Sequence, residues 1–146
     1  MRRLFGLLLI TLFAATACCD DASGPDSTVE GSYTLRSIDG TAMPYLFGVD
    51  TETGAEVHYF SSELTLFQSG TFREIDTFRF RLGTNSTFET DTISGVWTRS
   101  NNNVTLTLTT EDEGPLSLNG VWNGDDQLTF TEVDEEVGTV VYVFRK

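Results

Sequence analysis

The acidic side chains that could carry out chemistry in this sequence occur in closely spaced pairs, Glu74 with Asp76 and Glu89 with Asp91. Residues two positions apart in a β-strand point to the same side, so each pair would present two carboxylates on one face. Paired carboxylates can fix the polar end of a ligand, and at a suitable separation they catalyse glycoside hydrolysis. Acidic residues are abundant in this chain, 22 of 146, and nothing in the spacing fixes the separation that catalysis requires.

The segment around Glu74 and Asp76 alternates between apolar and basic side chains, which predicts a strand with one buried face. Even positions hold Phe72, Phe78, Phe80 and Leu82, and odd positions hold Arg73, Arg79 and Arg81. Both carboxylates share the apolar, even-numbered face. Either they face the interior as polar groups of a pocket, or a β-bulge near Ile75 turns them outward. We favour the bulge, because burying two unpaired charges is costly.

Nucleophilic and metal chemistry have little support in the sequence. His58 is the only histidine, and the only cysteines, Cys18 and Cys19, lie near the N-terminus. Histidine-based triads and zinc clusters are therefore not expected. No glycine-rich phosphate-binding motif occurs either. The sequence predicts neither an enzyme nor a metal or cofactor site.

The first residues of the chain have the pattern of an export signal. Met1-Arg2-Arg3 is basic, and the apolar run that follows, residues 4–15, is too short for an ordinary transmembrane helix. The run leads into Ala15-Thr16-Ala17-Cys18, which resembles the bacterial lipobox, where cleavage precedes a cysteine that then carries acyl chains such as palmitate. Ordinary secretory cleavage after Ala17 would also fit. We favour a signal peptide at 1–17 and lipidation of Cys18, because a free thiol directly after the cleavage point is a liability in an exported protein.

The rest of the chain is expected to be one acidic domain on a tether. Residues 18–30 are polar and aperiodic, which predicts a flexible tether before a domain over 31–146. The formal net charge is −13; removing residues 1–17 takes away two of nine basic and none of 22 acidic residues, which gives −15. Such a charge disfavours nucleic acid and anionic membrane surfaces as partners. Membrane contact would then come through the lipid, and we expect a lipid-anchored protein of the bacterial cell envelope, in the outer membrane.

The tripeptide Gly-Val-Trp occurs twice, ending at Trp97 and at Trp122, and each copy precedes a polar turn and an alternating strand. A two-residue loop at Asn101-Asn102 would place Trp97 opposite Leu106. A three-residue loop after the second copy would place Trp122 opposite Leu128. A glycine beside a large ring on one face suits a curved sheet. The pattern predicts successive hairpins of one meander, with both tryptophans inside.

Similar alternation and turn signals recur along the whole domain, with no helical pattern after the signal. This predicts an all-β fold, an antiparallel up-and-down meander that closes into a barrel of about eight to ten strands. A three-residue loop at 83–85 would place Phe80 opposite Phe88, and the alternation would shift again near Asp91. The irregular segment 43–47 is expected to lie across an open end, as a plug rather than a lid.

Three features together resemble the lipocalin-like domains of the calycin superfamily. They are Gly31-Ser32-Tyr33 in the first strand, a closing strand that ends in Arg145, and the hairpin meander between them. Tyr33 stands where that family has tryptophan. The resemblance implies a barrel over 31–146, a basic side chain (Arg145) packed over Tyr33, and a small apolar ligand inside. The hairpins are also similar to avidin-type barrels, although no set of residues implies biotin.

The sequence thus predicts a lipid-anchored envelope protein whose barrel binds a small apolar ligand. Six aromatic residues are expected to face the interior and contact it: Phe72, Phe78, Phe80, Trp97, Trp122 and Tyr142. The alternative is an envelope protein–protein interaction or inhibitor module with a filled barrel and no ligand. An eight-stranded barrel can be filled or hollow, so a cavity of several hundred Å³ would favour ligand binding and a packed interior the alternative.

Overall fold

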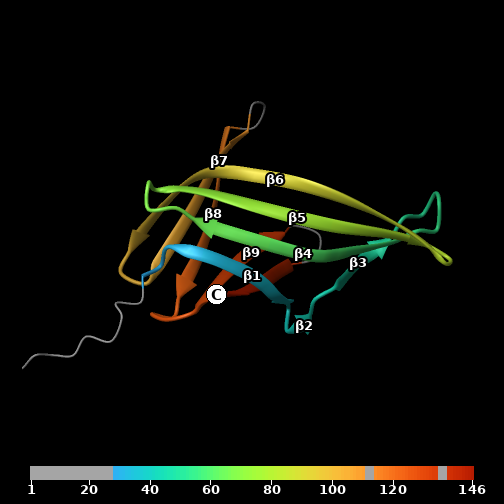
Figure 1. Cartoon of the computed structure of the whole chain (residues 1–146), viewed down its shortest axis with the longest axis horizontal. Helices are drawn as coiled ribbons and strands as arrows, with labels where there is room; N and C mark the ends of the chain where they lie inside the picture. The colour runs from blue at the N-terminus through green and yellow to red at the C-terminus, as the bar shows by residue number, and fades with distance from the viewer. Residues whose placement is uncertain (1–27, 111–113, 135–137) are drawn as a thin grey trace, which may run out of the picture.

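The structure, a computed structural model, describes residues 28–110, 114–134 and 138–146 (Figure 1). The expected signal peptide at 1–17, the anchoring residue Cys18 and the tether as far as residue 27 lie outside the described residues. These three assignments therefore stay predictions from the sequence.

The described residues form ten β-strands that close into a barrel. The strands are β1 (Gly31–Ile38), β2 (Thr41–Ala42), β3 (Tyr45–Val49), β4 (Glu56–Leu66), β5 (Thr71–Leu82), β6 (Asn85–Ser100), β7 (Asn103–Thr110), β8 (Gly114–Trp122), β9 (Gln127–Asp134) and β10 (Gly138–Arg145). From β4 to β10 each strand pairs antiparallel with the next, β10 pairs with β1, and β1 pairs with β4, where Tyr33 lies opposite Leu64. Eight strands, β1 and β4–β10, thus form a closed ring, while β2 and β3 add to its edges. The predicted all-β antiparallel barrel is confirmed.

Within the described ranges, no helix has the length and apolar character needed to cross a bilayer. The strands differ greatly in length, and the hairpin of β5 and β6 extends past the ring of the barrel (Figure 1). β3 pairs with the first half of β4, with Tyr45 opposite Tyr59, and β1 with the second half. The segment 43–47 was expected to plug an open end of the barrel. Most of it instead belongs to β3, which pairs with β4 at one end of the barrel.

Both Gly-Val-Trp hairpins form in the predicted register. Trp97 lies opposite Leu106 and Trp122 opposite Leu128. Asn101 has a φ of 56°, the left-handed conformation that asparagine tolerates in a tight turn. Local alternation and turn chemistry were enough to predict these pairs.

The glycine of each Gly-Val-Trp copy lies where a side chain would not fit. A Cβ at Gly95 would lie 2.2 Å from the carbonyl oxygen of Thr107, and one at Gly120 would lie 2.5 Å from Cδ1 of Phe130. Contacts this short would force the neighbouring strand or ring to move. The glycines let the strands curve and allow the interior rings to approach the backbone.

β5 keeps its alternation through both carboxylates. Glu74 lies opposite Leu64 of β4 and Ile93 of β6, and Asp76 holds the next position on the same face. Since directly opposite residues share a face, both carboxylates face the interior of the barrel. The bulge expected near Ile75 is wrong, because hydrogen-bond donors on the neighbouring strand offset part of the cost of burial.

The β5–β6 turn also differs from the expected one. Gly83-Thr84 is a two-residue turn, and Gly83 has a φ of 61° that suits so tight a connection. Phe80 therefore lies opposite Thr87 rather than Phe88. Strand β6 pairs with β5 without interruption on both sides of Asp91, so the predicted second change of the inward-facing positions near Asp91 is wrong as well.

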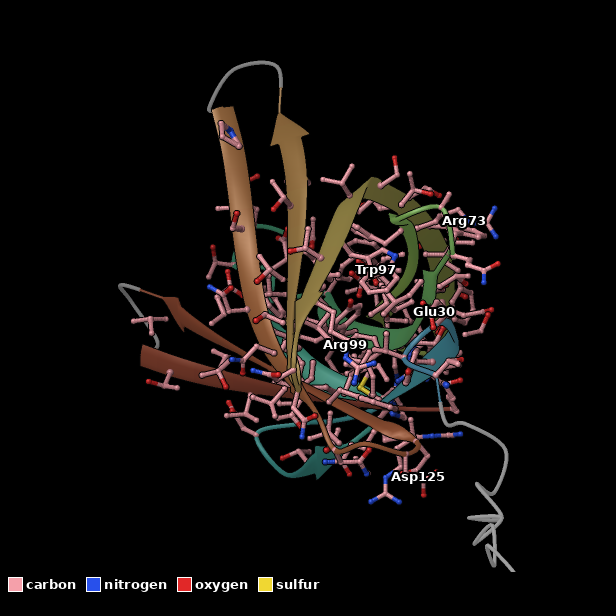
Figure 2. All side chains as sticks on the ribbon, turned by 90° about the vertical axis from the view of Figure 1, so that its left-hand side faces the viewer. Glu30, Arg73, Trp97, Arg99 and Asp125 are labelled. Atoms are coloured by element: carbon pink, nitrogen blue, oxygen red, sulfur yellow. The ribbon has the colours of Figure 1, made fainter. Side chains whose placement is uncertain are left out.

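One end of the barrel, the closed end, is filled with side chains. Tyr33 and Trp122 are 0 % and 3 % exposed there, and Trp97 packs against the same core. Figure 2 views the molecule from this side and shows Trp97 within the ring of strands and Arg73 outside it. The tryptophans therefore lie inside, as expected. Val29 is 1 % exposed and its carbonyl accepts a hydrogen bond of 2.5 Å from Tyr33, so the packed domain begins two residues before 31.

A basic side chain does cover Tyr33, but it is Lys146 rather than Arg145. The Nζ atom of Lys146 lies 5.2 Å from the centre of the Tyr33 ring and donates a hydrogen bond to the carbonyl of Thr28. Arg145 lies opposite Thr34, an exposed position, and its guanidinium is 3.9 Å from Asp126. The expected role of Arg145 is wrong because the alternation of β10 directs it to the outer face.

Candidate functional site

The half of the barrel away from the closed end is hollow. It holds a cavity of about 560 Å³, lined by residues of all eight barrel strands and of β3. Most of the lining is apolar: Ile38, Phe47, Leu64, Phe78, Ile93, Leu106, Leu118, Phe130, Val140 and Phe144. Phe47 on β3 is 72 % exposed although it lines the cavity, which places it at the mouth. We call this end of the barrel the open end.

Two carboxylates, Glu74 and Asp76, lie in this apolar lining, and each accepts a hydrogen bond from β4. Oη of Tyr59 donates to Oδ1 of Asp76 at 2.5 Å, and Oγ of Ser62 donates to Oε1 of Glu74 at 2.8 Å. Asp76 is only 6 % exposed. Among the described residues, no basic side chain forms an ion pair with either carboxylate.

A bulge in β4 brings both donors to the interior. The pairing of β4 with β5 shifts between Tyr59 and Ser61, so Phe60 and Ser61 together lie opposite Thr77. Without the extra residue, Tyr59 and Ser62, three positions apart, would point to opposite faces. The bulge therefore lets one strand supply both hydroxyls to the two carboxylates of the next.

The bulge also directs Phe60 outward. Its ring meets that of Phe88 edge to face at 5.2 Å, and the guanidinium carbon of Arg79 lies 5.6 Å from its centre. On the inner face, Tyr59 stacks on Phe78 with ring centres 5.0 Å apart and planes at 11°. These contacts on both faces hold Tyr59 in position beside Asp76.

Burial raises the pKa of the groups in this cluster. It is the main cause that raises the pKa of Glu74 to about 7, the charge of Asp76 adds to it, and the Ser62 hydrogen bond opposes it. Burial also raises the pKa of Asp76, with the Tyr59 hydrogen bond acting in the other direction. The pKa of Tyr59 is raised by burial and then by the charge of Asp76, so its hydroxyl remains a donor. With a pKa of about 7, Glu74 gains or loses a proton near neutral pH.

Two of the six aromatic residues expected at the ligand line the cavity, and the other four do not. Phe78 and Tyr142 line the cavity. Phe72 and Trp122, 2 % and 3 % exposed, belong to the packed core, and Trp97 donates its indole N–H to the carbonyl of Phe67 at 2.9 Å. Phe80 is half-buried on β5 and does not line the cavity. The interior is thus divided between a filled end and a hollow one, which alternation along single strands does not indicate.

Tyr59 and Ser62 are not among the residues that the sequence predicts at the site, and the predicted bulge would have turned the two carboxylates away from the interior. The regular alternation of Ser62, Leu64 and Leu66 places Ser62 on the inner face, but Tyr59 has the opposite parity. Only the bulge brings Tyr59 into the same face. The sequence therefore indicates only Ser62 for this part of the site, because its hydroxyl shares the buried face with Leu64 and Leu66.

The cluster can accept hydrogen bonds, attract a cation and exchange a proton near neutral pH. His58 is not among the lining residues and lies 3.1 Å from Glu56. In the part of the chain that the structure describes, no group of three or more His, Cys, Asp or Glu side chains could hold a metal ion. No family model matches this sequence, and no curated protein sequence gives a significant match.

Proposed function

We propose that this protein binds a small, mostly apolar ligand in the cavity at the open end of its barrel. The observation that carries the proposal is the cavity volume of about 560 Å³. Ligand sites in proteins commonly measure about 300–1,000 Å³ and combine apolar walls with a few polar groups. The filled-barrel alternative, an interaction or inhibitor module, accounts for the closed end but gives no role to the hollow half.

A pair of matched variants on β8 tests the cavity. Leu118 lines it, whereas Val121 is 53 % exposed on the outer face. Binding of a neutral probe, phenylbutanol, is measured by isothermal titration calorimetry. Leu118→Trp should weaken it by about tenfold or more by filling the cavity, and Val121→Trp by less than about twofold. Equal binding by all three proteins, or no binding to the unsubstituted protein, would contradict the proposal and favour the alternative.

We further propose that the barrel is held at the bacterial cell envelope, in the outer membrane, by acyl chains on Cys18. The support is the sequence Ala15-Thr16-Ala17-Cys18 after a basic start and an apolar run. The adjacent Cys19 provides a matched control. In a bacterial host, Cys18→Ser should remove the acyl mass from the protein and release it from the membrane fraction, and Cys19→Ser should leave it membrane-bound. Retention of acylated Cys18→Ser protein in the membrane would refute the anchor.

A further inference from the structure

The polar groups of the cavity carry negative charge without a balancing positive one. Three carboxylates belong to the lining: Asp76 is buried, Glu74 is half-buried and Asp39 is exposed. Asp91, opposite Asp76 on β6, is exposed and adds another negative charge nearby. Among the described residues, the cavity lining contains no lysine, arginine or histidine.

The hydroxyls of Tyr59 and Ser62 do not replace a cation. Each donates one hydrogen bond, to a single oxygen of Asp76 and of Glu74 respectively. A buried carboxylate retains a large desolvation penalty unless a positive charge is near it. A ligand with a positively charged group would offset that penalty, while a ligand with a carboxylate would add repulsion.

From this arrangement we propose that the ligand is an apolar amine, with its ammonium group held between Glu74 and Asp76 and its apolar body in the rest of the cavity. This inference rests on the proposed ligand-binding function and specifies the class of ligand. The ammonium group can donate up to three hydrogen bonds and so can reach both carboxylates. The stacked rings of Tyr59 and Phe78 beside Asp76 offer a π-surface that also attracts cations.

The apolar body has a matching surface beyond the carboxylates. Ile93 lies directly opposite Glu74 on the same face, and Leu118 and Phe130 come from the far side of the ring. The apolar lining therefore begins beside the carboxylate pair and continues across the barrel. This separation of charge from apolar surface fits an amphiphilic molecule with one cationic end.

Binding of an amine should depend on pH through the carboxylates. The titratable groups that face the pair are Tyr59 on β4, Asp91 on β6, Tyr45 on β3, Tyr142 on β10 and Asp39 after β1. Burial raises the pKa of Tyr59, so its hydroxyl stays protonated. Glu74, with its pKa raised to about 7, gains charge as pH rises through that value. An amine with a pKa near 10 stays protonated throughout, so its affinity should rise with pH.

Three probes with the same body test the charge preference: phenylbutylamine, phenylbutanol and phenylbutyrate. Each is titrated into the full chain in detergent, with Leu118→Trp protein under the same conditions to subtract partition into micelles. At about pH 8 the amine should bind about tenfold or more tightly than the alcohol, and the carboxylate more weakly than both. At about pH 5.5 the advantage of the amine should fall at least about threefold, because Glu74 is then protonated.

Substitutions identify the groups responsible. Glu74→Gln and Asp76→Asn should each reduce the preference for amine over alcohol, the ratio of the two affinities measured on the same variant, by about fivefold or more. Glu63→Gln removes the same charge from an exposed position on β4 and should change the preference less than about twofold. Circular dichroism checks that each variant keeps its strand content.

The outcomes separate the two proposals. If the alcohol binds in the cavity but the amine binds no more tightly, or the carboxylate binds best, the amine inference is overturned and ligand binding stands. If the charge preference is present but unchanged in Glu74→Gln and Asp76→Asn, the inference is also overturned. If no probe binds, both proposals fail.

Discussion

The hydroxyl oxygen of Tyr59 lies 2.5 Å from Oδ1 of Asp76, inside a barrel where Asp76 is 6 % exposed. This contact joins two adjacent strands at the point where β4 bulges. It explains how a carboxylate can occupy a position that the alternation of β5 reserves for apolar side chains. The donor satisfies one oxygen and leaves the charge available to the cavity.

Removing this donor should destabilise the protein. Tyr59→Phe leaves a buried carboxylate oxygen without its partner, so the free energy of unfolding should fall by about 1–3 kcal/mol at neutral pH. Tyr45→Phe is the matched control, because Tyr45 lines the same cavity but its hydroxyl makes no hydrogen bond within the described residues. Urea denaturation of both variants gives the comparison. Equal losses would mean that the Tyr59–Asp76 contact contributes little.

Glu74→Gln should stabilise the unliganded protein at alkaline pH. The pKa of Glu74 is raised from 4.5 to about 7 on folding, so between these values the folded protein binds more protons than the unfolded chain. Its contribution to stability is complete below about pH 4.5 and is lost as pH rises through about 7. The variant should therefore match the native protein near pH 4.5 and exceed it by up to about 3 kcal/mol at pH 8.

The measurement is the free energy of unfolding of both proteins across this pH range. Glu63→Gln, which changes an exposed acid on β4, should follow the native profile instead. A Glu74→Gln profile parallel to the native one would show that Glu74 titrates normally in the folded protein.

Gly95→Ala should be much more damaging than alanine at another strand glycine. The new methyl carbon would lie 2.2 Å from the carbonyl oxygen of Thr107, so β7 would have to move away, at a cost of about 1–3 kcal/mol or more. Gly48 on β3 has nothing within 4 Å of the same position. Gly48→Ala should therefore stay within about 0.5 kcal/mol of the native protein. Thermal or urea unfolding that ranks the two variants equally would contradict the close approach of β6 and β7.

Trp122→Ala should remove a central part of the closed end. The ring is 3 % exposed, its indole N–H donates to the carbonyl of Asp125 at 3.2 Å, and the guanidinium carbon of Arg99 lies 4.4 Å from its centre. Truncation should reduce the free energy of unfolding by about 3–5 kcal/mol. Val121→Ala, at the exposed neighbouring position, should cost less than about 1 kcal/mol. A loss below about 1 kcal/mol for Trp122→Ala would contradict the packing of this end.

The strands and most of the hairpin registers could be predicted from the sequence, because both depend on residues close together in the chain. Alternation in a strand selects the buried face, and Asn101 supplies the left-handed conformation for the turn after β6. The pair Trp97–Leu106 follows from those two facts, and the pair Trp122–Leu128 follows from alternation and a three-residue loop after the second Gly-Val-Trp copy. The same reasoning gave the wrong turn at Gly83, because the sequence there is compatible with both a two-residue and a three-residue loop, and the two-residue turn forms.

The site depended on contacts between strands, which local pattern does not report. Glu74 and Asp76 can face inward only if hydrogen bonds offset part of their desolvation. A bulge in β4 provides these bonds, because it places the hydroxyls of Tyr59 and Ser62 on the same inner face. The division of the interior into a filled and a hollow end depends on closure between β1 and β4, with Tyr33 opposite Leu64. Periodicity shows which side chains point inward. The volume left between them is determined only when all eight strands of the ring are in place, because each wall of the cavity comes from a different strand.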